Sequence, residues 1–154
     1  MKPGSYTQVY IQVVFAVKYR ERILKKEFRS RVFEYMSGIL KTMKHKPIIV
    51  NGVEDHVHVF FGLNPAISIS DTVHDIKRGS SLWINEQMFC NGKFAWQEGY
   101  GAFSYSRDAI DSVYRYIENQ ESHHAEISFK DEYRKFLNEF DVAHDEKYLF
   151  EFFD

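Results

Sequence analysis

The stretch 46-KPIIVNGVEDHVHVFFGL-63 decides the fold that the sequence predicts. It contains two short apolar runs, 46–53 and 56–63, joined through an Asn-Gly pair, and this combination is typical of a β-hairpin. Side chains alternate between the faces of a strand, so His56 and His58 are expected side by side on one face. Two neighbouring imidazoles can share a metal ion, or they can form the polar face of a half-exposed strand.

The segment before the hairpin predicts one strand and one helix. Residues 6–19 are rich in Val, Ile, Tyr and Phe and partly alternate in polarity, which indicates a long strand. Apolar residues recur at helical spacing from about Lys26 to Lys44, which predicts an amphipathic helix with a basic outer face.

A second helix is expected after a loop at 64–70. It begins at Ser70 or Asp71, either of which is a suitable N-cap, and it runs to about Met88. Gly79 and the two serines after it weaken the interior of this helix. They indicate either a functional segment or a tight contact between the helix and the sheet.

The last third of the chain predicts one strand and two helices. Residues 101–106 form the strand, and 107–124 form a helix with Ser106 as its N-cap. Residues 128–140 form a final helix that opens with a serine cap. The tail at 141–154 is acidic and ends in a strongly apolar run, so we expect it to dock on this chain or on a partner.

The predicted order, β-α-β-β-α-β followed by C-terminal helices, is the ferredoxin-like arrangement of the α+β class, which RNA-recognition modules share. Four antiparallel strands form a sheet with helices on one face, and the other face is expected to be free to bind something. His56 and His58 lie on a central strand of this sheet. A chain of 154 residues is long enough for one domain with a real core, so a single domain over 1–154 is expected.

The composition indicates in which compartment the protein works and what kind of partner it binds. Cys90 is the only cysteine, which excludes an intrachain disulfide and a Cys-rich zinc site. Without a signal-peptide pattern or a long apolar stretch, we expect a cytoplasmic protein with no membrane span. Residues 1–50 carry a net charge of +8, whereas 51–106 carry −3 and 107–154 carry −7. The asymmetry indicates a polyanion-binding surface at one end, or ends that neutralise each other within the fold or across a dimer.

The predicted helix at 107–124 carries a second candidate group. Tyr116 and Gln120 are four residues apart, so they share one helical face. A tyrosine beside a metal ion can act as a nucleophile, and the amide oxygen of Gln120 would complement two imidazoles on Mg²⁺ or Mn²⁺. Tyr105 and Tyr114 are rival nucleophiles on chemistry alone, but only Tyr116 has a glutamine four residues later.

The other histidines and one carboxylate are secondary candidates. His123 either approaches the metal or caps the end of its helix, and the cap is the favoured interpretation. Asp55 could orient a ligand histidine, although adjacent strand residues face opposite ways, which argues against it. The histidines expected to be ordinary surface or packing residues are His45, His74, His124 and His144.

In combination these motifs resemble one family over nearly the whole chain. The sequence is similar to the single-tyrosine HUH transposases of bacterial insertion sequences, the small TnpA-like enzymes of the insertion-sequence-200-like family. HUH denotes two histidines flanking a bulky hydrophobe, here His56, Val57 and His58. The segments that carry the resemblance are 18-KYRER-22, 55-DHVHVF-60, 77-KRGSSLWIN-85, 94-FAWQEGYGAFS-104, 116-YIENQ-120 with 123-HH-124, and 146-EKYLF-150.

The resemblance implies a reaction and a set of site residues. Tyr116 would attack a phosphodiester in single-stranded DNA, forming a 5′-phosphotyrosine and releasing a 3′-OH, and a 3′-OH would then rejoin the strand without ATP. His56, His58 and Gln120 would hold the Mg²⁺ or Mn²⁺ ion that polarises the scissile phosphate. Family members act as dimers in which the tyrosine helix can complete the partner's site, and they recognise imperfect DNA hairpins.

The basic first third of the chain would supply phosphate contacts. The candidate DNA-binding residues are Lys18, Arg20, Arg22, Lys25, Lys26 and Arg29, with Lys77 and Arg78 in addition. Three alternatives remain open: a module that binds single-stranded nucleic acid without cutting it, a domesticated endonuclease of the same family, and a metal-dependent hydrolase that needs no Tyr116.

Overall fold

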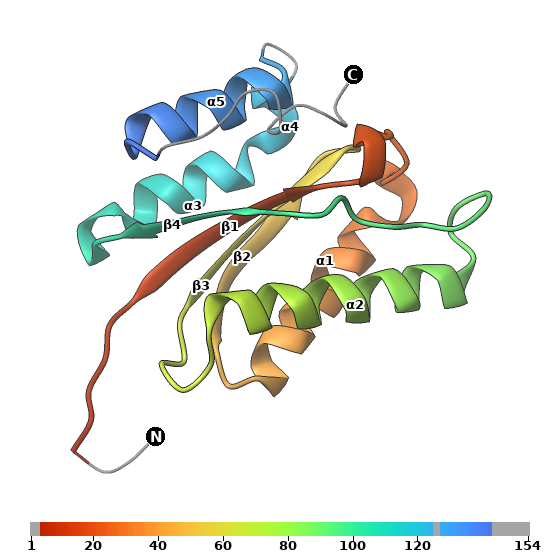
Figure 1. Ribbon diagram of the computed structural model, residues 1–154. Helices are drawn as coiled ribbons and strands as arrows, with labels where there is room; N and C mark the ends of the chain where they lie inside the picture. The colour runs from red at the N-terminus through yellow and green to blue at the C-terminus, as the bar shows by residue number, and fades with distance from the viewer. Residues whose placement is uncertain (1–3, 125–126, 143–154) are drawn as a thin grey trace.

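A single antiparallel sheet lies between two layers of helices in the computed structural model, which describes residues 4–124 and 127–142 (Figure 1). The order of strands across the sheet is β2-β3-β1-β4, so β3 is central. This agrees with the predicted ferredoxin-like arrangement and confirms the mixed α+β class. The strands are β1 (Tyr10–Ala16), β2 (Lys46–Gly52), β3 (His56–Gly62) and β4 (Gly101–Tyr105).

The main hydrophobic core lies under the helices α1 (Lys26–Thr42) and α2 (Ile69–Gln87). Val57, Val59 and Phe61 of β3 point into this core and are fully buried, as strand alternation predicts. His56 and His58 therefore face the opposite side of the sheet.

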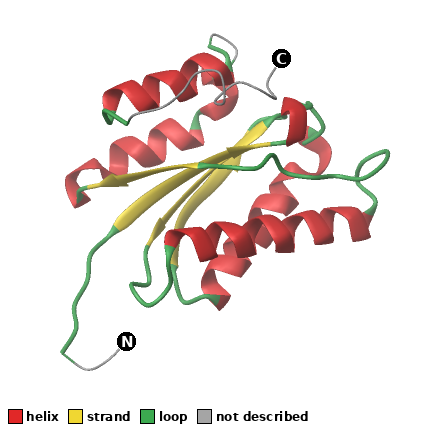
Figure 2. Cartoon of the chain, in the orientation of Figure 1, coloured by secondary structure: helices red, strands yellow, loops and turns green. Residues whose placement is uncertain are grey.

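That opposite side is not free, and this prediction was wrong. It is covered by α3 (Ile110–Glu118), the short α4 (Gln120–His123) and α5 (Phe129–Glu139), so helices flank the sheet on both sides (Figures 1 and 2). The reason is that α3 and α5 each bury an apolar stripe that requires a partner surface. Phe60 of β3 packs with α3, and Val14 of β1 packs with α5.

Several helix boundaries differ from the prediction. The N-cap of α2 is Ser68, whose Oγ accepts a hydrogen bond from the Asp71 amide at 3.0 Å, rather than Ser70 or Asp71. The helix expected at 107–124 is interrupted at Asn119, between α3 and α4.

The caps of the C-terminal segments were predicted with mixed success. Ser106 makes no capping bond to the short 3₁₀ turn that follows it, η2 (Arg107–Ala109). Ser128 does cap α5, as predicted, because its Oγ accepts from the Asp131 amide at 3.2 Å. The expected docking of the tail and the role of His144 concern residues outside the described ranges, apart from positions 141 and 142.

The first strand is shorter than the sequence indicated. After Ala16 the chain leaves the sheet through a 3₁₀ turn, η1 (Lys18–Arg20), in which Tyr19 and Arg20 have positive φ angles. Strand pairing cannot continue through a left-handed backbone, so β1 ends before the basic 18–22 segment.

Gly79 marks a contact between two helices rather than between a helix and the sheet. A Cβ atom at Gly79 would lie 2.8 Å from Cδ1 of Ile39 on α1. The neighbouring Ser80 donates a hydrogen bond to the Ile76 carbonyl and accepts one from Trp96 Nε1. The odd Gly-Ser run is therefore explained by packing of α2 against α1 and against the segment that leads to β4.

Candidate active site

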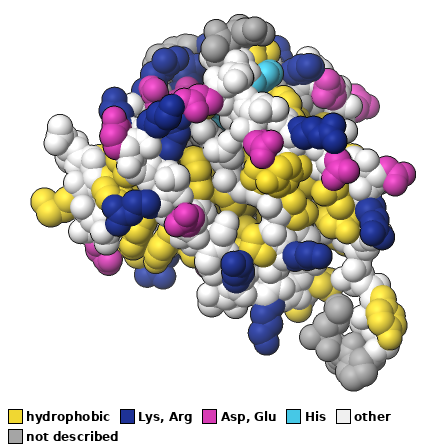
Figure 3. All heavy atoms as spheres, turned by 180° about the vertical axis from the view of Figure 1, so that it is seen from behind, with side chains coloured by type: hydrophobic (Ala, Val, Ile, Leu, Met, Phe, Trp, Pro, Cys, Tyr) yellow, Lys and Arg dark blue, Asp and Glu magenta, His cyan; other side chains and the backbone are white. Residues whose placement is uncertain are grey.

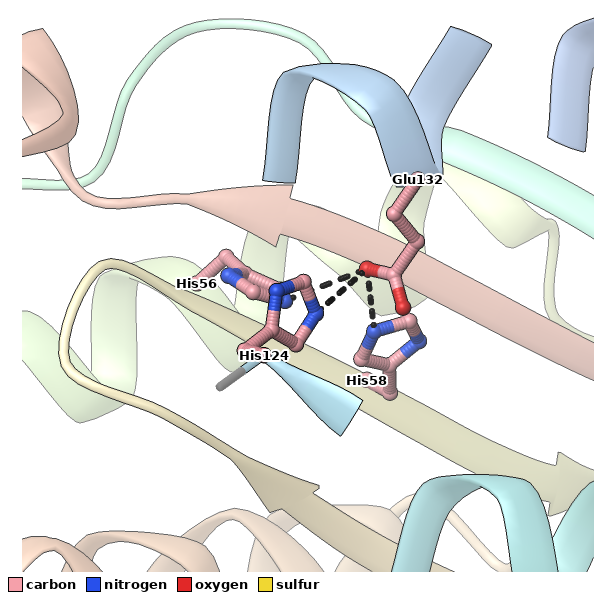
Figure 4. Close-up of side chains that lie close together, drawn as sticks. All are labelled: His56, His58, His124 and Glu132. Carbon is pink, nitrogen blue, oxygen red and sulfur yellow. Dashed lines mark hydrogen bonds and ion pairs between the residues drawn. The ribbon is translucent and has the colours of Figure 1, made fainter. Parts of the chain in front are cut away.

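Four side chains from separate parts of the chain meet beneath α5 (Figure 4). They are His56 and His58 of β3, His124 after α4, and Glu132 of α5, and their ligand atoms all lie within 4.8 Å of one another. The Nε2 atoms of His56, His58 and His124 lie 3.2, 3.1 and 3.1 Å from one Glu132 oxygen, Oε1. Below, this group is called the histidine–glutamate cluster.

The two histidines of β3 are held by hydrogen bonds on the side away from Glu132. His56 Nδ1 donates to Asp55 Oδ1 at 2.7 Å, and the Gln12 amide lies 2.8 Å from His58 Nδ1. Asp55 thus reaches a ligand histidine, contrary to the expectation from strand alternation, because it precedes the first residue of β3 and the strand does not yet fix its direction. The fully buried Gln12 is fixed in turn by Tyr105, whose hydroxyl donates to its Oε1. An acceptor on the outer nitrogen, as Asp55 is for His56, orients a metal-binding imidazole.

The pKa values of several groups in the cluster are shifted from their usual values. Burial alone would raise the pKa of Glu132, but the surrounding His58, His124 and His56 hold that pKa far below its usual range. Burial opposes the charged form of His56, yet its hydrogen bonds to Asp55 and Glu132 outweigh burial and raise its pKa. Burial lowers the pKa of His58. Glu132 is therefore an ionised carboxylate in a site that is almost completely closed to solvent.

The residues present fit a divalent metal ion. The Nε2 atom of His124 is buried and makes no hydrogen bond, although it faces Glu132 Oε1. Three imidazole nitrogens and a carboxylate oxygen form a donor set that suits first-row divalent ions. His124 was expected to be an ordinary surface or packing residue and Glu132 was not predicted to take part, so the positions of both correct the prediction.

Gln120 lies at the edge of the cluster and is fully buried. Its Oε1 is 3.3 Å from His56 Nε2, and its Nε2 is 3.3 Å from Glu132 Oε2. The structure thus brings together all three residues expected to hold the ion, His56, His58 and Gln120.

Tyr116 of α3 reaches the cluster directly. Its hydroxyl donates a hydrogen bond to Glu132 Oε2 and lies 3.1 Å from His123 Nε2. The side chain of His123 therefore faces Tyr116, and the structure gives no support to its interpretation as a helix cap. Burial and the charge of Glu132 raise the pKa of Tyr116. The rival Tyr105 bonds to Gln12 instead, and Tyr114 is exposed.

Two pockets flank the cluster. One, of about 210 Å³, lies on the Tyr116 side and is lined by Tyr105, Phe136 and Glu132. The other, of about 250 Å³, opens beside Asp55 and His124 and is lined by three of the predicted DNA-binding residues, Arg20, Arg22 and Arg29.

The predicted DNA-binding residues do not form one surface. Arg29 is buried, and both it and Lys26 pair with Glu121, at 3.7 and 3.0 Å. Lys18, Arg22 and Lys25 are exposed. On the face drawn in Figure 3, basic and acidic side chains are interspersed.

Lys77 and Arg78 line a different groove, of about 740 Å³, between α2 and the segment before β4. Lys77 Nζ donates to the carbonyl oxygens of Gln97 and Gly99 at 2.7 and 2.6 Å, and burial lowers its pKa to about 8. These contacts give Lys77 a structural part, and the structure does not bring the pair to the histidine–glutamate cluster.

Solved structures of other proteins share the fold of this chain. A solved structure from Deinococcus radiodurans R1, thought to be a transposase, matches with a TM-score of 0.61 and 21% identity over 78% of this chain and 96% of the other. The structure of a REP-associated tyrosine transposase bound to a REP hairpin matches with a TM-score of 0.60 and 11% identity over 82% of this chain and 76% of the other. At these identities the likeness shows a shared fold.

Sequence comparison supplies the family. A search of curated proteins finds no match. No helix among the described residues is long and apolar enough to cross a membrane. The model of the family described as "Transposase IS200 like" matches residues 5–120, about three quarters of the chain. The chain therefore belongs to the IS200-like transposase family.

Proposed function

We propose that this protein cleaves and rejoins single-stranded DNA at the ends of an insertion sequence, with Tyr116 as the nucleophile. One observation carries the proposal: the Tyr116 hydroxyl and the imidazoles of His56 and His58 all contact the carboxylate of Glu132. A nucleophile therefore lies beside a donor set that fits a divalent ion. Membership in the transposase family supports the reaction class.

In the proposed reaction Tyr116 Oη forms a bond to the scissile phosphorus while the bond from phosphorus to O3′ breaks. The phenolic proton has two acceptors at hand, Glu132 Oε2 and His123 Nε2. The products are a 5′-phosphotyrosine and a 3′-OH end. Attack by a 3′-OH reverses the step and releases Tyr116, so the energy of the phosphodiester is conserved.

Residues around the cluster orient the proposed metal ligands. Asp55 and Gln12 hold the imidazoles of His56 and His58 through their Nδ1 atoms, and Gln120 adds an amide oxygen beside His56. A divalent ion bound there would polarise the phosphate and stabilise the charge that develops on its oxygens.

The DNA would enter beside the arginines of the 250 Å³ pocket. Arg20 and Arg22 would contact backbone phosphates next to the cleaved bond. The REP hairpin carried by the structural relative supports a hairpin as the recognised feature. In this arrangement Tyr116 bonds to Glu132, which contacts His56 and His58 of the same chain, and this favours action in its own site; a homodimer is part of the proposal.

A covalent-adduct assay tests the proposal. The protein is incubated with labelled single-stranded DNA from the ends of its element, with Mg²⁺ or Mn²⁺, and products are separated on denaturing gels. We expect a DNA–protein band that disappears in Tyr116→Phe and His56→Ala. Tyr114→Phe is the matched control, because Tyr114 is an exposed tyrosine on the same helix and should leave the band unchanged.

Other outcomes would overturn parts of the proposal. Cut DNA without an adduct, persisting in Tyr116→Phe, would identify a hydrolase. Binding without cleavage under any ion would identify a non-cutting module. A band that survives Tyr116→Phe and disappears in Tyr105→Phe would transfer the nucleophile to Tyr105.

A further inference from the structure

We propose that His124 and Glu132 complete the metal site, and that the resulting set of three imidazoles and one carboxylate selects a transition-metal ion over Mg²⁺. The inference rests on the proposed function for the presence of an ion in this site. It differs from the expectation drawn from the family resemblance, in which His56, His58 and Gln120 hold Mg²⁺ or Mn²⁺.

The positions of the donor atoms are the first support for a bound ion. Three Nε2 atoms converge on Glu132 Oε1 at 3.1 to 3.2 Å, and they come from β3 and from the end of α4 (Figure 4). Ordinary hydrogen bonding does not fully explain this convergence, because the 3.1 Å contact between His124 Nε2 and Glu132 Oε1 does not have hydrogen-bond geometry. A cation between these donors would satisfy all of them together.

The burial of the histidine–glutamate cluster is the second support for a bound ion. His56 and His58 have no solvent exposure, and Glu132 has 1%. Polar groups at such depth are normally fully paired, and groups that are not paired call for an explanation such as a bound ion. The side chain of His124 is 9% exposed, so it belongs to the same closed site.

The chemical types of the donor atoms indicate which ion the cluster prefers. Mg²⁺ is a hard ion that prefers oxygen ligands and retains several waters. Imidazole nitrogens favour ions such as Zn²⁺, Co²⁺ and Fe²⁺, and affinity at nitrogen sites rises along the first row towards Cu²⁺. With three imidazoles to one carboxylate, the cluster offers mostly nitrogen donors. Gln120 Oε1, 3.3 Å from His56 Nε2, is the nearby oxygen for a further contact.

Calorimetric titration of the chelator-stripped full chain tests the inference. We expect one saturable ion per chain, with Zn²⁺ and Co²⁺ bound at least about tenfold more tightly than Mg²⁺. His124→Ala and Glu132→Gln should each weaken Zn²⁺ binding at least about tenfold. His74→Ala is the matched control, because His74 is an exposed histidine on α2, and it should leave the affinity unchanged.

A second measurement needs no variant and so avoids any loss of folding. Long-range ¹H–¹⁵N spectra of the histidine rings should show Zn²⁺-dependent shifts of the ring nitrogens of His56, His58 and His124. The rings of His45 and His74 should not shift. A ring spectrum in which His124 is unaffected by Zn²⁺ would overturn the inference, as would equal affinities for Zn²⁺ and Mg²⁺.

The outcomes separate this inference from the proposed function. Tight Zn²⁺ binding that depends on His124, with no DNA adduct under any ion, would retain the metal site and refute the transposase reaction. Adduct formation that is supported by Mg²⁺ and unchanged in His124→Ala would do the reverse.

Discussion

Asp55 acts on the candidate metal site without belonging to it. Its Oδ1 accepts from His56 Nδ1 at 2.7 Å, which directs His56 Nε2 towards Glu132. Asp55→Ala removes this acceptor and should weaken metal binding about 10- to 100-fold, measured by calorimetry. Asp55→Asn keeps an oxygen acceptor and should lose much less. Equal affinities for the wild-type protein and Asp55→Ala would show that His56 is oriented by its packing alone.

His45 makes the stability of the fold depend on pH independently of the metal site. Its Nδ1 accepts from the Asn64 amide at 2.8 Å, and its Nε2 donates to Thr72 Oγ1, which itself donates to the Ser68 carbonyl. Both ring nitrogens are satisfied in the neutral form, and burial lowers the pKa of His45 below 6.5.

The sign of this effect follows from the lowered pKa. As pH falls, the unfolded chain takes up the proton before the folded chain does, so the contribution is present above pH 6.5 and is lost below it. Between about pH 7.5 and 5.5, the free energy of unfolding should fall more steeply for the wild-type protein than for His45→Asn. Urea unfolding at several pH values measures both slopes, and identical slopes would contradict the assignment.

At the scale of the elements, two glycines within helices have opposite expected effects. Gly38 in α1 has open space around a built Cβ, so Gly38→Ala should stabilise the fold by about 0.5 to 1 kcal/mol through helix propensity. Gly79 in α2 contacts Ile39 of α1, so Gly79→Leu should destabilise it by about 1 to 3 kcal/mol through overpacking. Urea denaturation of the two variants is the measurement. A stabilising Gly79→Leu would mean that the α1–α2 contact is loose.

The elements were more predictable than their partners. The hairpin of β2 and β3 follows from the two apolar runs and their alternation, but the turn was misplaced: Asn51 and Gly52 pair within the ladder as part of β2, and residues 53–55 make the turn. The covering of the second sheet face by α5 depends on long-range packing that no local pattern specifies. The break at Asn119 was missed because the apolar periodicity of α3 does not show where its hydrogen bonding stops.

Some residues of the candidate site could likewise be predicted from local sequence patterns, and others could not. His56, Tyr116 and Gln120 were found because each lies in a short motif. Glu132 lies far along the chain, and its one signal is a carboxylate on the apolar face of α5, three residues after Phe129. A charge in that position indicates a buried partner, but it does not identify the partner.

For the molecule as a whole, the charge asymmetry of the sequence gives a testable prediction on DNA binding. Arg22 is exposed beside the pocket that leads to His124. If it contacts a phosphate, Arg22→Ala should reduce the slope of log affinity against log salt by about 0.7 for single-stranded DNA. Lys41, exposed near the C-terminal end of α1, is the control and should leave the slope unchanged on substitution by alanine. Fluorescence anisotropy over a range of salt concentrations measures both, and an unchanged slope for Arg22→Ala would remove that contact.

The complete burial of His56 and His58 beneath α5 has a consequence for kinetics. If the chain cleaves DNA as proposed, only the fraction of molecules in which α5 has shifted enough for a phosphate to reach these histidines from the bordering pockets, with Glu132 still in the site, is competent to react. The observed affinity at the reacting centre is the intrinsic affinity multiplied by that fraction. Substitutions in the packing of α5, remote from the proposed chemistry, would then alter the cleavage rate.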